Sequence, residues 1–195
     1  MNKSLCPILA ELTVQGGSQG RYFKFTVAVI AAVAFSTGCS TVDTNGPLNA
    51  GEDQDEICAP AQLDGFTALG DIVMNEGDQE LTITGLELVE ATDLTLEESY
   101  FMVINPEGDD DVLGGASTVA DSPQEEAAWE RRGELENSTL GPGEKANVIV
   151  GLSLPNPGAD GEAEAMRITY SDGTREYTAD TDMRMILVGE EKGCL

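Results

Sequence analysis

Residues 166–187, MRITYSDGTREYTADTDMRMIL, decide the fold class. Apolar side chains recur at every second position, first on Met166, Ile168 and Tyr170. After the polar stretch SDGT (171–174), the apolar positions are the odd ones: Tyr177, Ala179, Met183, Met185 and Leu187. A period of two is typical of strands with one buried face, and Asp-Gly between two such runs favours a tight turn. The stretch therefore predicts a β-hairpin.

The same period occurs elsewhere, each time beside turn residues. Residues 81–88 alternate but change parity across Gly85, which predicts a bulge or kink at that glycine. Gly-Pro-Gly at 141–143 precedes another alternating run, on Val148, Val150, Leu152 and Leu154. Further strand candidates are residues 72–75 and 99–105. We therefore expect residues 57–195 to form one all-β domain, an immunoglobulin-like β-sandwich.

One short helix is expected inside this domain. Ser122 can act as the N-cap, Pro123 suits the first helical position, and Glu125 completes a capping box. Gly133 can end the helix. The pattern predicts a helical insertion of about ten residues between two strands.

Two turn motifs in the domain have counterparts in a known family. Residues 74–77, MNEG, precede an alternating strand, and residues 140–144, LGPGE, precede a valine-rich one. This combination, over about residues 72–170, resembles bacterial immunoglobulin-like modules of the hydin-related kind. The chain departs from that pattern through an acidic insertion at about 107–135. The resemblance implies an adhesive, accessory or spacer domain.

The first 38 residues have the layout of an export signal. Lys3, Arg21 and Lys24 precede the uncharged apolar run 25–35, which is shorter than the about 20 residues that a membrane-spanning helix needs. Residues 36–39, STGC, then resemble the lipobox of bacterial lipoproteins, in which the cysteine becomes the lipidated first residue. The resemblance implies a signal peptide at 1–38 and a lipid, including palmitate, on Cys39.

A second cleavage position stays open, because residues 32–34, AVA, fit the small-x-small pattern of an ordinary signal peptidase site. Cleavage there would give a soluble secreted protein. The cysteine count favours lipidation: Cys39, Cys58 and Cys194 follow the leader, and a lipid on Cys39 would leave an even pair. Cys58 and Cys194, at the two ends of the domain, are then expected to form a disulfide in an oxidising compartment.

The segment between the signal and the domain is polar. Residues 40–56, STVDTNGPLNAGEDQDE, contain only three aliphatic side chains, too few to offset the entropy of ordering them. We expect residues 39–56 to be a flexible acidic tether with a reach of about 20–25 Å.

Charge and composition exclude several functions. The chain has 195 residues, a formal net charge of -26 and no histidine. Histidine-based nucleophile systems, histidine zinc sites and blue-copper sites are therefore excluded. Nucleic acid is an improbable partner, since its phosphates would be repelled.

Four acidic side chains between Glu107 and Asp111 form the first candidate site, for calcium. Their spacing lacks the alternation of an EF-hand loop, so a solvated loop is the better interpretation. The same interpretation applies to Asp160, Glu162 and Glu164. We therefore assign no metal ligand, and a divalent-cation-dependent factor stays an alternative.

Sulfur and aromatic side chains are the other candidates. Met183 and Met185 could bind Cu(I), but on a strand they share a face with Leu187, which favours core packing. Trp129, the single tryptophan, could stack on a carbohydrate or anchor an interface, but packing of its helix on the sandwich is favoured.

These observations predict a lipoprotein on the extracytoplasmic face of a bacterial cell membrane, with a non-catalytic binding, accessory or structural role. Its expected partners are the membrane, through the lipid, and a protein of the cell envelope. We expect no enzyme activity and no cofactor. The alternatives are a soluble secreted immunoglobulin-like protein and the cation-dependent factor.

Overall fold

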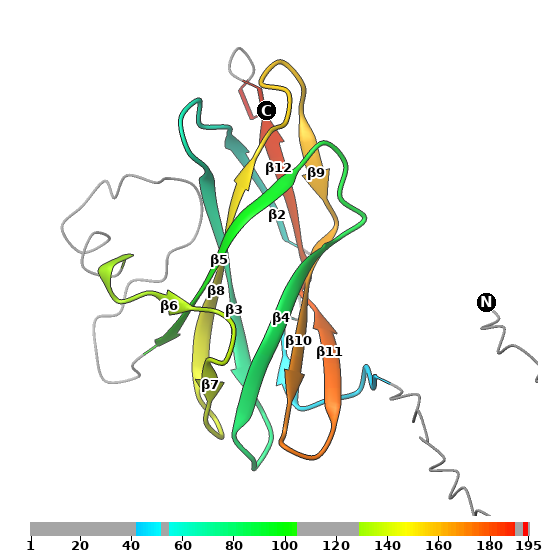
Figure 1. The fold of residues 1–195 in the computed structure, drawn as a ribbon. Helices are drawn as coiled ribbons and strands as arrows, with labels where there is room; N and C mark the ends of the chain where they lie inside the picture. The colour runs from blue at the N-terminus through cyan, green and yellow to red at the C-terminus, as the bar shows by residue number, and fades with distance from the viewer. Residues whose placement is uncertain (1–41, 52–54, 105–128, 190–192, 195) are drawn as a thin grey trace, which may run out of the picture. The chain divides into compact units, whose positions relative to one another are not determined.

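The computed structural model describes residues 42–51, 55–104, 129–189 and 193–194. The chain divides into two compact units, Met1–Gly38 and Cys39–Leu195, and all described residues belong to the second. Its strands, labelled in Figure 1, are β1 (Leu48–Asn49), β2 (Asp55–Pro60), β3 (Thr67–Asn75), β4 (Leu81–Val89), β5 (Thr95–Ile104), β6 (Gly133–Glu134), β7 (Thr139–Leu140), β8 (Lys145–Ser153), β9 (Gly161–Ala163), β10 (Ala165–Ser171), β11 (Glu176–Asp180) and β12 (Met183–Val188).

The strands form two layers. One is the sheet β1-β3-β8-β5-β6; the other contains the sheets β11-β10-β4-β7 and β2-β12-β9. These last two continue one another, because β9 and β10 follow each other along the chain and pair with β12 and β11. Principal strands in the order A-B-E-D opposite C-F-G define the constant-type immunoglobulin arrangement. In the described residues, β1, β3, β8 and β5 follow the order A-B-E-D, and β4, β10 and β11 follow the order C-F-G. The predicted all-β immunoglobulin-like sandwich is therefore confirmed.

The quoted hairpin is present as β10 and β11, with Ser171 opposite Glu176. Only Gly173 of the turn has a positive φ, 85°. Asp172 contributes through its side chain: its carboxylate accepts hydrogen bonds from the Thr174 hydroxyl (2.6 Å) and from the backbone N–H groups of Thr174 and Arg175 (both 2.8 Å). These bonds, the one from the Thr174 hydroxyl foremost, hold the pKa of Asp172 well below its usual range. The turn therefore depends on an ionised aspartate.

The predicted irregularity at Gly85 is confirmed. The register between β4 and β10 shifts where Gly85 pairs with Thr169 and Ile83 pairs with Tyr170. This shift leaves Thr84 as an extra residue in β4 and returns Leu86 and Leu88 to the inner face. A bulge was therefore readable from the change in hydrophobic parity.

The core lies between the two layers. The predicted alternation is confirmed, since Met166, Ile168 and Tyr170 are fully buried. Met183 and Met185 are 3% and 0% exposed and belong to the same cluster. Core packing is thus the correct interpretation of the methionine pair. Within the described ranges, no helix is long and apolar enough to cross a bilayer.

The two turn motifs of the family resemblance lie against each other. Asn75 is completely buried. Its side-chain amide donates to the backbone oxygens of Gln79 (2.8 Å) and Leu140 (2.9 Å), and its own oxygen accepts from Gly77 N–H (2.9 Å). The backbone oxygen of Asn75 accepts from Gly143 N–H (2.8 Å). One asparagine thus fixes the β3–β4 turn to the turn before β8, which explains why the two motifs occur together.

Two boundaries need comment. The expected domain start at residue 57 is wrong: Leu48 and Ala50 are buried in the core and β1 pairs with β3, so part of the expected tether belongs to the domain. The expected helix after Ser122 falls mostly on residues 105–128, outside the described residues. Gly133, expected to end that helix, is the first residue of β6.

Candidate functional site

The segment that follows Cys39 is attached to both layers of the sandwich. Asp43 lies beside β11: its N–H donates to Glu176 O (3.3 Å), and its oxygen accepts from Thr178 N–H (3.0 Å). Five residues later, the N–H of Leu48 donates to the Tyr170 hydroxyl (3.2 Å) as β1 pairs with the end of β3. The segment thus crosses from the edge of one sheet to the edge of the other.

Gly46 makes this crossing possible. A Cβ at this position would overlap the Tyr170 hydroxyl and would lie 2.8 Å from the ring of Tyr177. The two tyrosine rings stack with centroids 5.4 Å apart, and Tyr170 is fully buried. The tight fit of the backbone on these rings holds residues 43–50 on the domain.

This attachment shortens the link to the proposed lipidation residue. Cys39 lies outside the described residues, but only residues 40 and 41 separate it from Val42. An extended chain spans at most about 3.6 Å per residue, so three steps reach about 11 Å. The expected reach of 20–25 Å is therefore too long.

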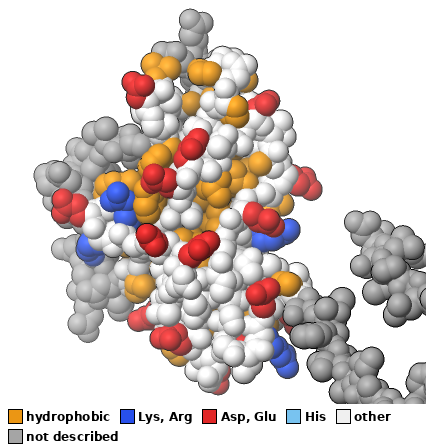
Figure 2. Space-filling view, viewed as in Figure 1, with side chains coloured by type: hydrophobic (Ala, Val, Ile, Leu, Met, Phe, Trp, Pro, Cys, Tyr) orange, Lys and Arg blue, Asp and Glu red, His pale blue; other side chains and the backbone are white. Residues whose placement is uncertain are grey.

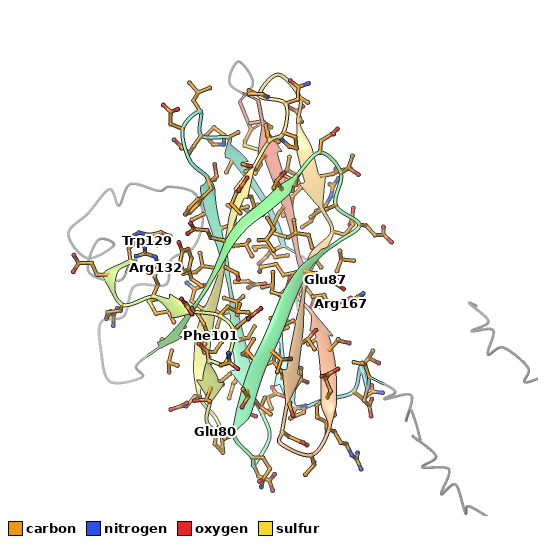
Figure 3. The ribbon with its side chains drawn as sticks, viewed as in Figure 1. Glu80, Glu87, Phe101, Trp129, Arg132 and Arg167 are labelled. Atoms are coloured by element: carbon orange, nitrogen blue, oxygen red, sulfur yellow. A yellow bond between two sulfur atoms is a disulfide. The ribbon has the colours of Figure 1, made fainter. Side chains whose placement is uncertain are left out.

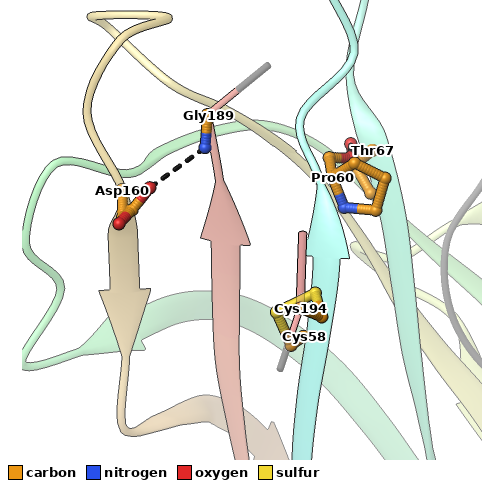
Figure 4. Close-up of a disulfide and its surroundings, with 6 residues drawn as sticks. All are labelled: Cys58, Pro60, Thr67, Asp160, Gly189 and Cys194. Atoms are coloured by element: carbon orange, nitrogen blue, oxygen red, sulfur yellow. Dashed lines mark hydrogen bonds between the residues drawn. A yellow bond between two sulfur atoms is a disulfide. The ribbon is translucent and has the colours of Figure 1, made fainter. Parts of the chain in front are cut away.

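Cys58 and Cys194 form a disulfide, as expected from the cysteine count, with their Cα atoms 5.7 Å apart (Figure 4). It joins residues 136 apart in sequence and so closes nearly the whole domain. In the same region, the Thr67 hydroxyl donates to Pro60 O (3.0 Å) and Gly189 N–H donates to the carboxylate of Asp160 (3.1 Å). Asp160 thus stabilises the end of β12.

The other acidic candidates on β9 and beside it are also structural. Arg184 on β12 binds the carboxylate of Glu162, approaches Glu164 at 3.4 Å, and binds Glu56 on β2 at 2.8 Å. This arginine holds three neighbouring carboxylates on one surface. Residues 107–111 lie outside the described residues. In the ranges that the structure describes, no cluster of three or more acidic or cysteine side chains is arranged to hold a metal ion.

Trp129 packs on the outer face of β5, in agreement with the packing interpretation. Its ring meets Tyr100 edge-on, with centroids 5.3 Å apart. Arg132 lies over the Trp129 ring at 4.0 Å and over Tyr100 at 4.8 Å (Figure 3). The sequence did not predict this contact, in which Arg132 covers one face of the tryptophan ring.

One carboxylate that the sequence did not single out lies on the inner face of a strand. Asp71 of β3 pairs with Val148 of β8. It alternates along β3 with Leu69 and Val73, whose side chains are buried in the core. Burial raises the pKa of Asp71, and the negative charges of Asp55 and Asp182 add to the effect. The hydrogen bond from Ile72 N–H to a carboxylate oxygen of Asp71 (2.8 Å) lowers the pKa and partly offsets this rise. The ionised side chain is therefore unfavourable in the fold.

Substituting Asp71→Asn should stabilise the protein at pH 7. Because the folded pKa is raised, the contribution of Asp71 to stability is fully present below the unfolded value of 3.8 and is lost as pH rises through the folded value. Asparagine keeps the acceptor for Ile72 without the charge. We therefore expect a higher free energy of unfolding and a higher Tm for the variant than for the wild-type chain at pH 7.

Thermal unfolding measured at pH 7 and pH 3.5 checks this prediction, with Asp64→Asn, at an exposed position, as the control. The gain should be present at pH 7 and nearly absent at pH 3.5. An equal gain at both values would assign the effect to something other than the charge.

Comparisons with known proteins give few matches. No family model matches the chain, and a search of curated proteins finds no match. Among solved structures, it is similar to the ASH / PapD-like domain 7 of human CEP192: 14% identity, a TM-score of 0.38, and coverage of 83% of this chain and 98% of that one. It is also similar to the VesB protease of Vibrio cholerae: 13% identity, a TM-score of 0.36, and coverage of 72% of this chain but only 32% of that one. At these TM-scores neither likeness supports a statement about function.

Proposed function

We propose that the chain is a lipoprotein on the extracytoplasmic face of a bacterial cell membrane, anchored by a lipid on Cys39 and held close to the bilayer. The observation that supports the proposal is that two of the cysteines are joined in a disulfide and a third is left for the lipid. Cys58 and Cys194 are joined to each other, which suits an oxidising compartment. Of the cysteines after the export signal, this leaves Cys39, the residue that the STGC motif would acylate.

The role proposed for the domain is non-catalytic: binding, accessory or structural. Two of the candidate groups are already engaged, which supports this role: Arg184 holds Glu162 and Glu164 in ion pairs, and Arg132 covers one face of Trp129. The net charge of -26 favours cationic over anionic partners. A protein of the cell envelope fits this description better than nucleic acid or an anionic polymer.

Metabolic labelling with palmitate tests the anchor. The full chain and its Cys39→Ser variant would be expressed in a bacterial host, fractionated into membrane and soluble parts, and measured by intact mass. We expect the wild-type chain to carry the label, to begin at Cys39 and to sediment with membranes. The variant should lose the label and leave the membrane fraction.

Cys6→Ser is the matched control, since Cys6 lies within the leader, and it should behave as the wild-type chain. A mature chain that begins at Phe35 with a free Cys39 thiol would refute the anchor and support the soluble secreted form.

A further inference from the structure

A segment of the chain crosses between the two layers on each long side of the sandwich, but on the β4–β5 side part of each strand edge has no described partner. On one side, residues 43–50 cross between the layers. On the other, residues 133–140 cross from β5 to β4: β6 pairs with Tyr100 and Phe101, and β7 pairs with Leu81 and Thr82. Leu135, in the middle of this crossing, is buried in the core. Beyond these contacts, β4 and β5 continue to the loop that joins them, with no described strand between them (Figure 1).

The outer edge of β4 beyond Ile83 is unpaired among the described residues. Val89 O accepts from Glu164 N–H, so the backbone groups of Val89 face the β9–β10 side. Backbone groups of successive strand residues point to alternate sides. Leu88 and Leu86 therefore direct their N–H and C=O groups away from β10, toward the open side. On β5, the described part of the chain likewise offers no pairing partner to residues 95–99 on the side away from β8.

The space between these edges has an apolar floor. The side chains of Leu86, Leu88, Leu94 and Leu96 are partly buried and pack against the core. Figure 2 shows hydrophobic side chains gathered in a band at the centre of this face. An added strand could therefore place alternate side chains on leucines while its backbone pairs with β4.

The borders of this band are acidic. Glu87 lies on the β4 side with 66% of its side chain exposed, and Glu90, Glu97 and Glu98 are exposed on the loop and on β5. Acidic side chains border the band in Figure 2. Arg167, the nearby cation, is bound by Asp180 through two hydrogen bonds of 2.7 Å and also lies 3.5 Å from a carboxylate oxygen of Glu87, so one cation faces two carboxylates. The border therefore keeps a negative charge.

We propose that the β4–β5 side binds an extended basic peptide segment of a partner protein, in which apolar residues alternate with lysine or arginine. The segment adds to the edge of β4 as an antiparallel strand. Its apolar side chains contact Leu86 and Leu88, and its cationic side chains lie near Glu87. This inference deepens the binding role of the proposed function but does not depend on the lipid.

Charge selects this occupant over a second copy of the chain. Pairing β4 with β4 of another molecule would bring like charges together at Glu87 and Glu90, at an edge of a chain whose net charge is -26. Like charges at the border of an interface oppose association. A cationic strand gains from the same groups.

Fluorescence anisotropy with the purified full chain tests the proposal. The probe is a labelled, acetylated octapeptide of alternating valine and lysine, VKVKVKVK. A valine–glutamate peptide of the same length should bind at least about tenfold more weakly. In the proposed pairing the valine N–H groups face β4, so N-methylation of the valines should weaken binding at least about tenfold. N-methylation of the lysines, whose N–H groups face away, is the matched control.

A protein variant locates the site. Glu87→Lys should weaken binding of VKVKVKVK about fivefold. Glu80→Lys, the same change just before β4 (Figure 3), should leave it within about twofold, because seven steps of extended chain, about 23 Å, separate it from Glu87, which is more than a Debye length. Equal binding by the two N-methylated peptides, or no saturable binding up to millimolar peptide, would overturn the proposal. Concentration-dependent dimerisation that the peptide does not reverse would instead assign the edge to a second copy. Palmitate labelling is unaffected by any of these outcomes.

Discussion

Replacing both Cys58 and Cys194 with serine should lower the free energy of unfolding by about 3–5 kcal/mol, the largest single effect expected for this protein. The disulfide links residues 136 apart. In the chain-entropy description, a cross-link that closes a loop of more than 100 residues lowers the conformational entropy of the unfolded chain, which stabilises the fold by about 5 kcal/mol. Removal of a native disulfide typically costs about 2–5 kcal/mol. Denaturant unfolding of the two proteins, followed by circular dichroism, measures the difference.

Three controls separate the cross-link from other effects of the substitutions. A reducing agent should destabilise the wild-type chain to the level of the double variant and leave the double variant unchanged. Cys39→Ser should alter membrane attachment without shifting the unfolding midpoint. Identical midpoints for the oxidised wild-type chain and the double variant would contradict the prediction.

The parts of the fold that the sequence predicted are those set by local patterns. Alternation placed Met166, Ile168 and Tyr170 on one face, and the parity change at Gly85 placed a bulge that the register of β4 and β10 confirms. Both signals arise from side chains that are neighbours along one strand. The disulfide was predicted by a different kind of argument: an even number of cysteines remains after the expected leader once Cys39 is assigned to lipidation.

The parts that the sequence did not predict depend on contacts between distant segments. β2 pairs in parallel with β12, which comes more than 120 residues later in the chain. This pairing places Glu56 beside Arg184, while the antiparallel pairing of β12 with β9 brings Glu162 to the same arginine. The pKa of Asp71 is likewise raised by burial between the layers and by the charges of Asp55 and Asp182, which come from other segments of the chain.

The N-terminal segment shows why average composition was misleading. Residues 40–56 are mostly polar, and a segment of that composition does not bury enough surface to order itself. Ordering here rests on few residues: Leu48 and Ala50 enter the core, β1 pairs with β3, and Gly46 fits against two tyrosines. Specific contacts of this kind are invisible to a count of aliphatic side chains.

Substituting Gly46→Ala should therefore destabilise the domain by about 1–3 kcal/mol, the cost typical of forcing an extra carbon into a packed site. The new Cβ would collide with the Tyr170 hydroxyl and the Tyr177 ring. Tyr170 is completely buried and stacked on Tyr177, so it has no free space to move into. The less costly response is release of residues 43–50, with loss of the β1–β3 pairing.

Hydrogen exchange followed by mass spectrometry distinguishes this local release from a uniform loss of stability. Faster exchange should be confined to residues 43–50 and to the amides that pair with them: Met74, opposite Asn49, Glu76, whose N–H donates to Pro47 O (2.9 Å), and Thr178, whose N–H donates to Asp43 O. Gly85→Ala is the matched control, because a Cβ there meets no atom within 4 Å. In the lipid-anchored form, release would lengthen the link between Cys39 and the folded domain from about 11 Å to an extended limit of about 40 Å. Unchanged protection of residues 43–50 in Gly46→Ala would mean that the tyrosine pair, and not the N-terminal segment, gives way.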